Sequence, residues 1–406
     1  MVRELKQSLL ISLWFVFLTF PLLVVRVNTI ENVVVWRWGN ILWVAIGAFV
    51  LSYCWRYMLA RRKRQTRKAE EGVDTRGPLQ AALDNVQLRN RAMAVLLVLA
   101  AIFPLVFDTY QTSIMVTALI FVVLGLGLNI GVGLAGLLDL GYVAFFGVGA
   151  YTYAILNANF DLGFWMVLPI GGVLGCLFGV LLGFPILRLR GDYLAIVTLG
   201  FGMIFKVVME NWKTLSKGPS GIANIDRPGL FGLEMTLEQS TVFIYYIIVA
   251  LVILTIIVTN RLKNSRVGRA WIALREDEVA CVAMGIDMAR TKLSAYALGA
   301  FWAGMVGVVF AAKTTFINPA GFTFMQSAII LSIVVLGGMG SILGVILGAF
   351  ILVLLPEYLR AFSEYRMLVF GAAMTLMMIF RPQGLISNLR QIYQYKGSKD
   401  KTAHDG

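Results

Sequence analysis

Residues 314–356 contain no Asp, Glu, Lys or Arg, an uninterrupted run of 43 residues. A helix that crosses the hydrocarbon core of a membrane needs roughly 20 mostly apolar residues. The run is therefore long enough for two passes. It includes the sequence GGMGS at 337–341, a turn signal placed where a break between the passes would fall. We predict a chain built from membrane-spanning helices.

Similar charge-free stretches occur along the whole chain. They cover 7–25, 38–55, 92–107, 109–138, 140–160, 162–187, 193–205 (continuing past Lys206), 241–260, 293–312 and 367–380. The 406 residues are 59% hydrophobic and 14% charged, whereas a soluble domain is about 45–50% apolar and about 25% charged. This composition excludes a soluble enzyme, a disordered tail and a nucleic-acid-binding protein, despite the formal net charge of +13. We predict an all-α polytopic membrane protein with about 10–12 membrane-entering helices, of which ten or eleven are full spans.

Lys and Arg are unevenly distributed among the loops. Residues 61–91 hold nine basic and four acidic residues, 261–292 hold seven and four, and the tail from Arg381 holds five and two. Residues 212–240 hold three of each. Cytoplasmic loops carry the excess of Lys and Arg. We therefore expect both termini and residues 61–91, 188–192 and 261–292 to be cytoplasmic, and residues 212–240 to be periplasmic.

The same pattern suggests three parts. We expect 1–91 to be an N-terminal two-span extension with a basic cytoplasmic linker, 92–385 the main transmembrane domain, and 386–406 a cytoplasmic tail. The linker either anchors the topology or lies along anionic membrane lipid, which attracts basic residues by about 1 kcal/mol per charge.

Small residues recur at intervals of four along several predicted spans. The two longest series are Gly171, Gly175, Gly179, Gly183 and Ala295, Gly299, Ala303, Gly307, Ala311. Positions i and i+4 share a helix face, so each series forms a smooth ridge on which another helix backbone packs closely. The ridges pack helices within this chain, or they form a seam with a second membrane subunit or slide during gating.

The chain contains few of the residue types and motifs that catalysis or metal binding needs. Cys54, Cys176 and Cys281 lie far apart without metal-ligand spacing, and the single histidine is His404. The chain contains no G-x-x-x-x-G-K-[ST] phosphate loop. We therefore expect no catalytic, cofactor-binding or metal-binding residue and no ATP hydrolysis by this chain. Asp139, next to Gly141 and Tyr142, is either a gating residue or a helix cap at a cytoplasmic turn.

The basic loop at residues 261–292, which we call the coupling loop because it joins two expected spans, is the most informative segment. A short helix is expected over 277–284, ended by Gly285, with Ala280, Cys281 and Ala283 as a small-residue surface flanked by Trp271. The charge cluster Arg275, Glu276, Asp277 and Glu278 precedes this surface. This composition suits either docking into another protein or an ordinary surface helix. The segment resembles the cytoplasmic coupling segment of ABC-importer permeases, in which an E-A-A stretch is followed by glycine. Val279 occupies the leading acidic position here, and Glu278 stands one residue early.

Longer motifs resemble the branched-chain amino-acid permeases of ABC importers, in particular the M-type subunits of Liv systems. They are LGLGLN at 124–129, GFPILRLRGDYLAIVTLG at 183–200, GRAW at 268–271, LREDE at 274–278, VVLGGMGS at 334–341 and RPQGL at 381–385. They cover 92–385 in order, and the two-span extension is also typical of this subunit. The first motif adds Asn129 to Asp139 and Tyr142 as candidate pore or gating positions.

The resemblance implies a heteromer in the bacterial inner membrane. Its other members would be a second, H-type permease, two cytoplasmic ATP-binding subunits and a periplasmic amino-acid-binding protein. The implied substrates are leucine, isoleucine and valine. Two alternatives remain: an ABC permease for another small solute such as urea, or an ion-coupled secondary transporter, which would use broken helices such as 337–341.

Overall fold

The computed structural model describes residues 25–28, 33–36, 100 and 102–358, except 187–188, 190 and 230–235, together with 371, 375 and 384–386. The chain forms two compact units, Met1–Leu96 and Leu97–Gly406. In the first unit, strands β1 (Val25–Asn28) and β2 (Val33–Trp36) form an antiparallel hairpin. The following lie outside the described residues: the expected span 38–55, nearly all of the expected spans 7–25 and 367–380, most of 92–107, the linker 61–91 and nearly all of the tail 386–406.

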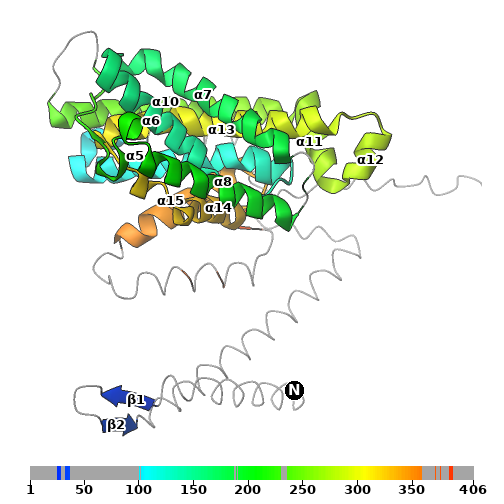
Figure 1. Cartoon of the computed structure of the whole chain (residues 1–406), viewed down its shortest axis with the longest axis horizontal. Helices are drawn as coiled ribbons and strands as arrows, with labels where there is room; N and C mark the ends of the chain where they lie inside the picture. Colours follow the sequence, from blue (N-terminus) through cyan, green and yellow to red (C-terminus); the bar gives the residue numbers. More distant parts are fainter. Residues whose placement is uncertain are drawn as a thin grey trace, which may run out of the picture. The chain divides into compact units, whose positions relative to one another are not determined.

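The second unit is a bundle of apolar helices (Figure 1). Its long helices are α5 (Thr109–Leu128), continued by the π-helix η1 (Asn129–Leu134), then α6 (Val143–Phe160), α7 (Phe164–Ile186), α8 (Asp192–Asn211), α10 (Leu237–Lys263), α13 (Met288–Thr314), α14 (Phe324–Gly337) and α15 (Ile342–Tyr358). Six helical stretches among the described residues are long and apolar enough to cross a membrane. The prediction of an all-α polytopic membrane protein is confirmed.

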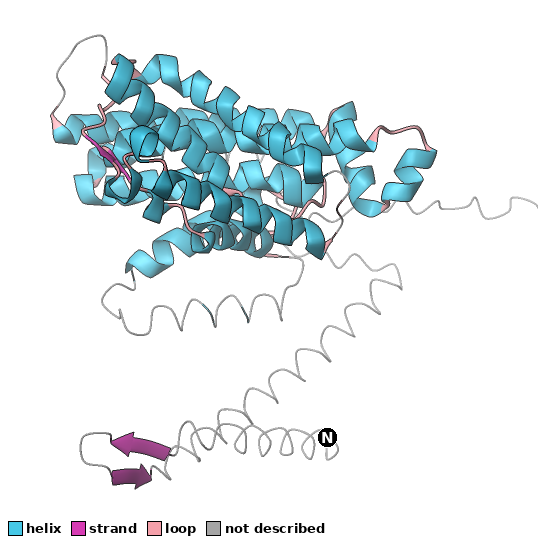
Figure 2. Ribbon diagram, in the orientation of Figure 1, coloured by secondary structure: helices cyan, strands magenta, loops and turns pink. Residues whose placement is uncertain are grey.

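The remaining elements are short and lie between the long helices (Figure 2). They are α9 (Lys213–Ser216), the 3₁₀ turns η2 (Gly218–Ser220) and η3 (Pro319–Gly321), the paired strands β3 (Ile222–Ala223) and β4 (Phe316–Ile317), α11 (Arg266–Glu276) and α12 (Glu278–Ala283). We call residues 212–240, which the sequence predicts to be periplasmic, the outer loop. The two strands join this loop to the segment after α13. The loop and the end of α13 are thereby fixed at the same end of the bundle.

Helices α5, α6 and α13 form the core of the bundle, and α6 is buried throughout Val143–Ala154. The share of residues buried is 72% in the apolar window of α5 with η1 and 78% in that of α13, but 22% for α8 and 33% for α10. An apolar helix that remains exposed in a single chain is left for lipid or for another subunit. These inner helices therefore define the fold, and the outer helices present the apolar surface.

The glycine ridge of α7 packs against α13 within this chain. A Cβ added at Gly175 would lie 2.5 Å from the Ala300 carbonyl oxygen, and one at Gly179 would lie 2.6 Å from Ala300 Cβ. On α13, a Cβ at Gly307 would lie 2.7 Å from the Ala150 backbone nitrogen, and Gly299 faces Gly127. Of the roles predicted for these ridges, packing within the chain is the one that the contacts show.

The long run at 314–356 breaks where the sequence predicts. Helix α14 ends at Gly337 and α15 begins at Ile342. Gly338 and Gly340 have φ values of +113° and +81°, which side-chain-bearing residues rarely adopt. Backbone N–H groups of Leu385 and Ile386 donate to the carbonyls of Leu336 and Gly337 at 2.8 and 3.1 Å. The GGMGS and RPQGL motifs thus meet in space.

We predict that Gly175→Ala destabilises the bundle although alanine has the higher helix propensity. The added methyl group meets the Ala300 carbonyl, and overpacking of this kind costs about 1–3 kcal/mol. Gly200→Ala in α8 is the matched control because no heavy atom lies within 4 Å of its Cβ position. Thermal unfolding of the purified protein in detergent should show a lower midpoint for Gly175→Ala only. Equal midpoints for the two variants would contradict the packing described above.

Candidate functional site

The coupling loop folds into two helices, α11 and α12, rather than the single helix expected. The Ser265 hydroxyl caps α11 by accepting from the Gly268 N–H at 3.2 Å. Asp277 separates the helices, and its Oδ1 accepts from the N–H groups of Val279 and Ala280 at 2.8 and 3.1 Å. Side-chain oxygens at such positions satisfy the first N–H groups of a helix. The boundary is thus set by Asp277, one of the four predicted coupling charges.

Gly285 ends α12 in the left-handed conformation, with a φ of +79°. Its N–H donates to the Val282 carbonyl, and the Ile286 N–H donates to the Cys281 carbonyl, both at 3.0 Å. This pair of bonds is a Schellman motif, in which glycine carries no steric penalty. The predicted helix stop at Gly285 is confirmed, and α12 itself, Glu278–Ala283, lies within the predicted range 277–284.

Trp271 and Cys281 turn inward, so of the small-residue surface expected from the sequence only Ala280 and Ala283 are exposed. Trp271 is fully buried, and its Nε1–H donates to the Thr291 carbonyl and to Ser294 Oγ at 3.1 and 3.0 Å. Cys281 is also buried. A large apolar side chain with its N–H satisfied belongs to a core. Trp271 therefore holds α11 against the start of α13.

Two of the four predicted charges also contact the chain's own helices. Glu278 Oε1 lies 2.8 Å from Nζ of Lys292, whose side chain is 1% exposed. Arg275 Nη1 donates to the Gly133 carbonyl at 2.6 Å. Removing one partner of a buried ion pair leaves an uncompensated charge, which is costly. Glu278 and Lys292 thus fix α12 to α13, while Arg275 connects α11 to η1.

Helix α12 and the residue that follows it expose three apolar side chains. Val279 is 67% exposed, Val282 53% and Met284 82%, and we call these three residues the apolar face of α12. They adjoin Ala280, which is also exposed. Exposed apolar side chains gathered in one place mark interaction sites. Sequence reasoning missed this face because it gave weight to the neighbouring charges.

The three candidate pore or gating residues are all buried and hydrogen-bonded. Asn129 Oδ1 accepts from the Gly340 N–H at 2.8 Å, and the Tyr142 hydroxyl donates to the Gly299 carbonyl at 2.8 Å. Asp139 is 3% exposed, and its Oδ1 accepts from the Gly141 N–H at 2.8 Å. Each side chain fixes the path of the backbone where it leaves helical geometry.

Asp139 lies in an irregular, buried segment between η1 and α6, and its side chain does not cap α6. The segment 135–142 that contains it packs inside the bundle: the Leu140 N–H donates to Thr198 Oγ1 on α8, and the Val143 N–H donates to Ser327 Oγ on α14, both at 3.0 Å. Irregular backbone at membrane depth needs such internal partners. The expected span 140–160 therefore starts within the bundle, as α6 at Val143.

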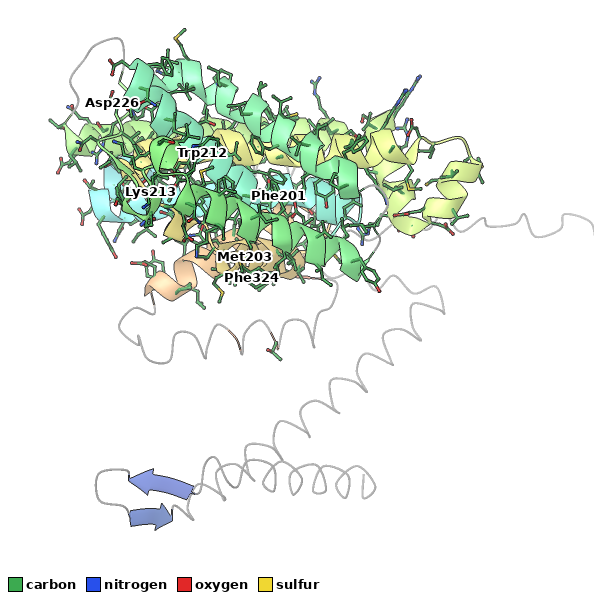
Figure 3. All side chains as sticks on the ribbon, viewed as in Figure 1. Phe201, Met203, Trp212, Lys213, Asp226 and Phe324 are labelled. Carbon is green, nitrogen blue, oxygen red and sulfur yellow. The ribbon has the colours of Figure 1, made fainter. Side chains whose placement is uncertain are left out.

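The outer loop is fixed to the opposite end of the bundle from α11 and α12 (Figures 1 and 3). Asn157 Nδ2 donates to Asp226 Oδ2 at 2.9 Å, and the Asp226 N–H donates to Asn157 Oδ1 at 3.0 Å. The Tyr153 hydroxyl donates to the Asp226 carbonyl at 2.8 Å. Lys206 and Glu210 form an i,i+4 pair at 3.5 Å on α8. The two ends of the bundle thus carry different ordered surfaces.

The described residues contain no group of three or more His, Cys, Asp or Glu side chains that could hold a metal ion. Buried helix packing, internal breaks and ordered end surfaces instead define a multi-pass membrane protein of the permease class. Residues 110–378 match the family described as "Branched-chain amino acid transport system / permease component". The chain belongs to this family of permease subunits.

Individual relatives agree with the family match. The chain is 43% identical over 386 residues to the high-affinity branched-chain amino acid transport system permease protein LivM of Escherichia coli K12, covering 90% of this chain and 89% of the relative. It is 24% identical over 288 residues to LivH of the same organism, covering 66% and 91%. The autoinducer 2 import system permease protein LsrC of an Enterobacter species is 25% identical over 292 residues, covering 68% and 81%. No solved structure shows a significant match.

The resemblance to the M-type subunit predicted from the motifs is thus confirmed. The chain is therefore similar to both LivM and LivH, which are two permease proteins of the high-affinity branched-chain amino acid system in one organism.

Proposed function

We propose that this permease subunit forms the membrane passage of an ATP-driven importer for leucine, isoleucine and valine. It would pair with a second, H-type permease in the inner membrane and take its energy from two cytoplasmic ATP-binding subunits. A periplasmic binding protein would deliver the substrate. The main support is the 43% identity to LivM across 90% of the chain.

The ATP-binding subunit would dock on the apolar face of α12. Three features of the described residues favour this surface: it is apolar, it projects from the end of the bundle that carries the basic coupling loop, and α12 is fixed to α13 by the Glu278–Lys292 pair. Basic loops face the cytoplasm, where ATP is available. In this proposal Asp277, Glu278 and Gly285 shape and hold α12, and Arg275 holds α11 to η1. The exposed residues Glu276 and Ala280 would lie at the contact.

The binding protein would dock on the outer loop. The reciprocal Asn157–Asp226 hydrogen bonds and the β3–β4 pairing support this role because they hold the loop in one conformation. A preordered surface loses less conformational freedom when a partner binds.

We predict that Asn157→Leu weakens stimulation of transport by the binding protein. The substitution keeps the side-chain size and removes both bonds to Asp226, one of them to a charged group, which contribute about 1.5–3 kcal/mol. The binding-protein concentration for half-maximal ATP hydrolysis should rise about tenfold. Asn211→Leu, which loses only a local bond to the Val207 carbonyl, is the matched control. An unchanged concentration for Asn157→Leu would exclude the outer loop as the docking surface.

The proposed substrates are zwitterions with apolar side chains. Charged side chains that would clamp both the α-carboxylate and the α-ammonium are scarce in the spans, so selectivity would reside mainly in the binding protein. The passage would reject solutes by size and by the cost of burying additional charge.

Uptake into proteoliposomes that contain the complete complex tests the substrate. Labelled leucine should enter and be displaced by isoleucine and valine but not by urea. A complex that carries urea, or none of the three amino acids, would remove this substrate assignment and leave the permease architecture standing.

A further inference from the structure

Two interruptions of helical geometry meet in the bundle. The first is η1, the π-helical continuation of α5 that starts at Asn129, and the second is the turn between α14 and α15 that contains Gly340. Asn129 Oδ1 accepts from the Gly340 N–H at 2.8 Å although the two residues are 211 positions apart. We call this meeting point the crossing.

The crossing has no room for a further side chain. A Cβ added at Gly133 would lie 2.5 Å from the Gly340 backbone nitrogen. π-Helical bulges and glycine breaks occur frequently at functional sites because the backbone there has more than one accessible arrangement. The crossing is thus tightly packed and is built from segments suited to rearrangement.

Two cations reach the crossing from the coupling loop. Lys263, the last residue of α10, donates from Nζ to the Gly340 carbonyl at 3.1 Å. Arg275 of α11 donates from Nη1 to the Gly133 carbonyl at 2.6 Å. Both acceptors lie where regular helical hydrogen bonding is interrupted, and cations are stabilised near such carbonyl-rich helix ends.

Arg275 is directed to its acceptor by a close contact with Gly136. A Cβ at Gly136 would lie 2.8 Å from Arg275 Cγ, and Gly136 has a φ of +73°. The absence of a side chain at Gly136 therefore lets the arginine stem pass close to the backbone.

The apolar face of α12 is connected to the crossing through α11, which precedes α12 in the chain. Helix α11 is held to α13 by Trp271, and α12 is held to α13 by the Glu278–Lys292 pair. A displacement of α12 by a partner would therefore act on α11 and, through Arg275, on η1. Lys263, at the end of α10, would act on the second interruption, the turn between α14 and α15.

We propose that Arg275 and Lys263 are positioning residues that connect the cytoplasmic docking helix to the crossing, so that movement of α12 changes the Asn129–Gly340 contact and with it the passage. This inference rests on the proposed function. It assigns to Arg275 an inward connection, and it adds Lys263, which the sequence did not single out.

The test uses the complete complex in proteoliposomes with the variants Arg275→Gln and Lys263→Met. Three quantities are measured: the ATP-binding subunit retained on purification, the rate of ATP hydrolysis, and leucine taken up per ATP hydrolysed. Assembly and hydrolysis should remain within about twofold of the unmodified complex. Uptake per ATP should fall about tenfold or more, corresponding to the loss of one charge-assisted hydrogen bond.

Arg269→Gln is the matched control, because Arg269 lies on the same helix and donates only to the nearby Asn264 carbonyl at 3.1 Å among the described contacts. It should leave the uptake per ATP unchanged, and Lys263→Arg should retain most of it. In the double variant Arg275→Gln/Lys263→Met, the loss should be smaller than the product of the single losses because both residues act on one crossing.

Two outcomes would overturn the proposal. In one, uptake per ATP is normal in both single variants. In the other, both variants fail to assemble, or uptake falls only in proportion to the amount of assembled complex. Either result would show that Arg275 and Lys263 only stabilise the structure. Failure of the proposed function is distinguished by Val279→Glu in the same assay. If that variant retains the ATP-binding subunit, the docking surface is wrong whatever the result at the crossing.

Discussion

Val279→Glu should abolish stable association with the ATP-binding subunit. Val279 is 67% exposed on α12 and belongs to its apolar face. A carboxylate at this position would be buried without a partner in the proposed interface, at a cost of several kcal/mol. The affinity should fall about 100-fold, equivalent to about 3 kcal/mol.

The position of Val279 makes the test specific. An acidic residue in the first turn of a helix is compatible with its dipole, so α12 should still form. Val267→Glu is the matched control, because Val267 is also the second residue of its helix, α11, and is 43% exposed. Co-purification in detergent should show the subunit lost in Val279→Glu and kept in Val267→Glu. Equal retention would show that α12 is not the contact.

Gly285→Val should uncouple ATP hydrolysis from transport. Gly285 has a φ of +79°, and a residue with a side chain pays roughly 1–2 kcal/mol for left-handed geometry, with β-branched residues paying more. No heavy atom lies within 4 Å of its Cβ position, so the effect comes from the backbone. The end of α12 should lose its two closing hydrogen bonds, and substrate-stimulated hydrolysis should fall about tenfold.

The variant Gly285→Asn distinguishes the effect of backbone strain from the effect of side-chain size. Asn tolerates the left-handed region better than other side-chain-bearing residues, so Gly285→Asn should retain most of the coupling and Gly285→Ala should be intermediate. Normal substrate-stimulated hydrolysis in Gly285→Val would show that the loop is only a linker between α10 and α13.

Features that depend on neighbouring residues were predictable from sequence. The break at 337–341, the stop at Gly285 and the Lys206–Glu210 pair each follow from local backbone or helix geometry. So does the ridge of α7, because its interval of four places the glycines on one face. What the ridge packs against, α13, required the structure.

Contacts between distant segments were not predictable in this way. Arg275 and Gly133 are 142 positions apart, and Lys263 and Gly340 are 77 apart. Local composition made Arg275 part of a charge cluster at a partner contact, whereas in the fold its guanidinium donates to the Gly133 carbonyl while the residue stays exposed. Trp271 was misjudged for the same reason, because its partners Thr291 and Ser294 belong to the next long helix.

Asp139 shows the limit of a hydropathy reading. The sequence left two roles open for Asp139, a gating residue or a helix cap at a turn, because charges mark the ends of spans. It did not predict an irregular buried segment whose backbone N–H groups are satisfied by Thr198, Ser327 and the carboxylate of Asp139 itself. Such compensation depends on helices far along the chain.

Leucine uptake with and without the ATP-binding subunits tests the central claim most directly. The permease pair alone and the complete complex would be placed in matched proteoliposomes, with ATP supplied on the side of the coupling loop and loaded binding protein on the other. We expect uptake only in the complete complex, and only with hydrolysable ATP. Leucine transport by the permease without ATP-binding subunits, driven by an ion gradient, would contradict the account and identify a secondary transporter.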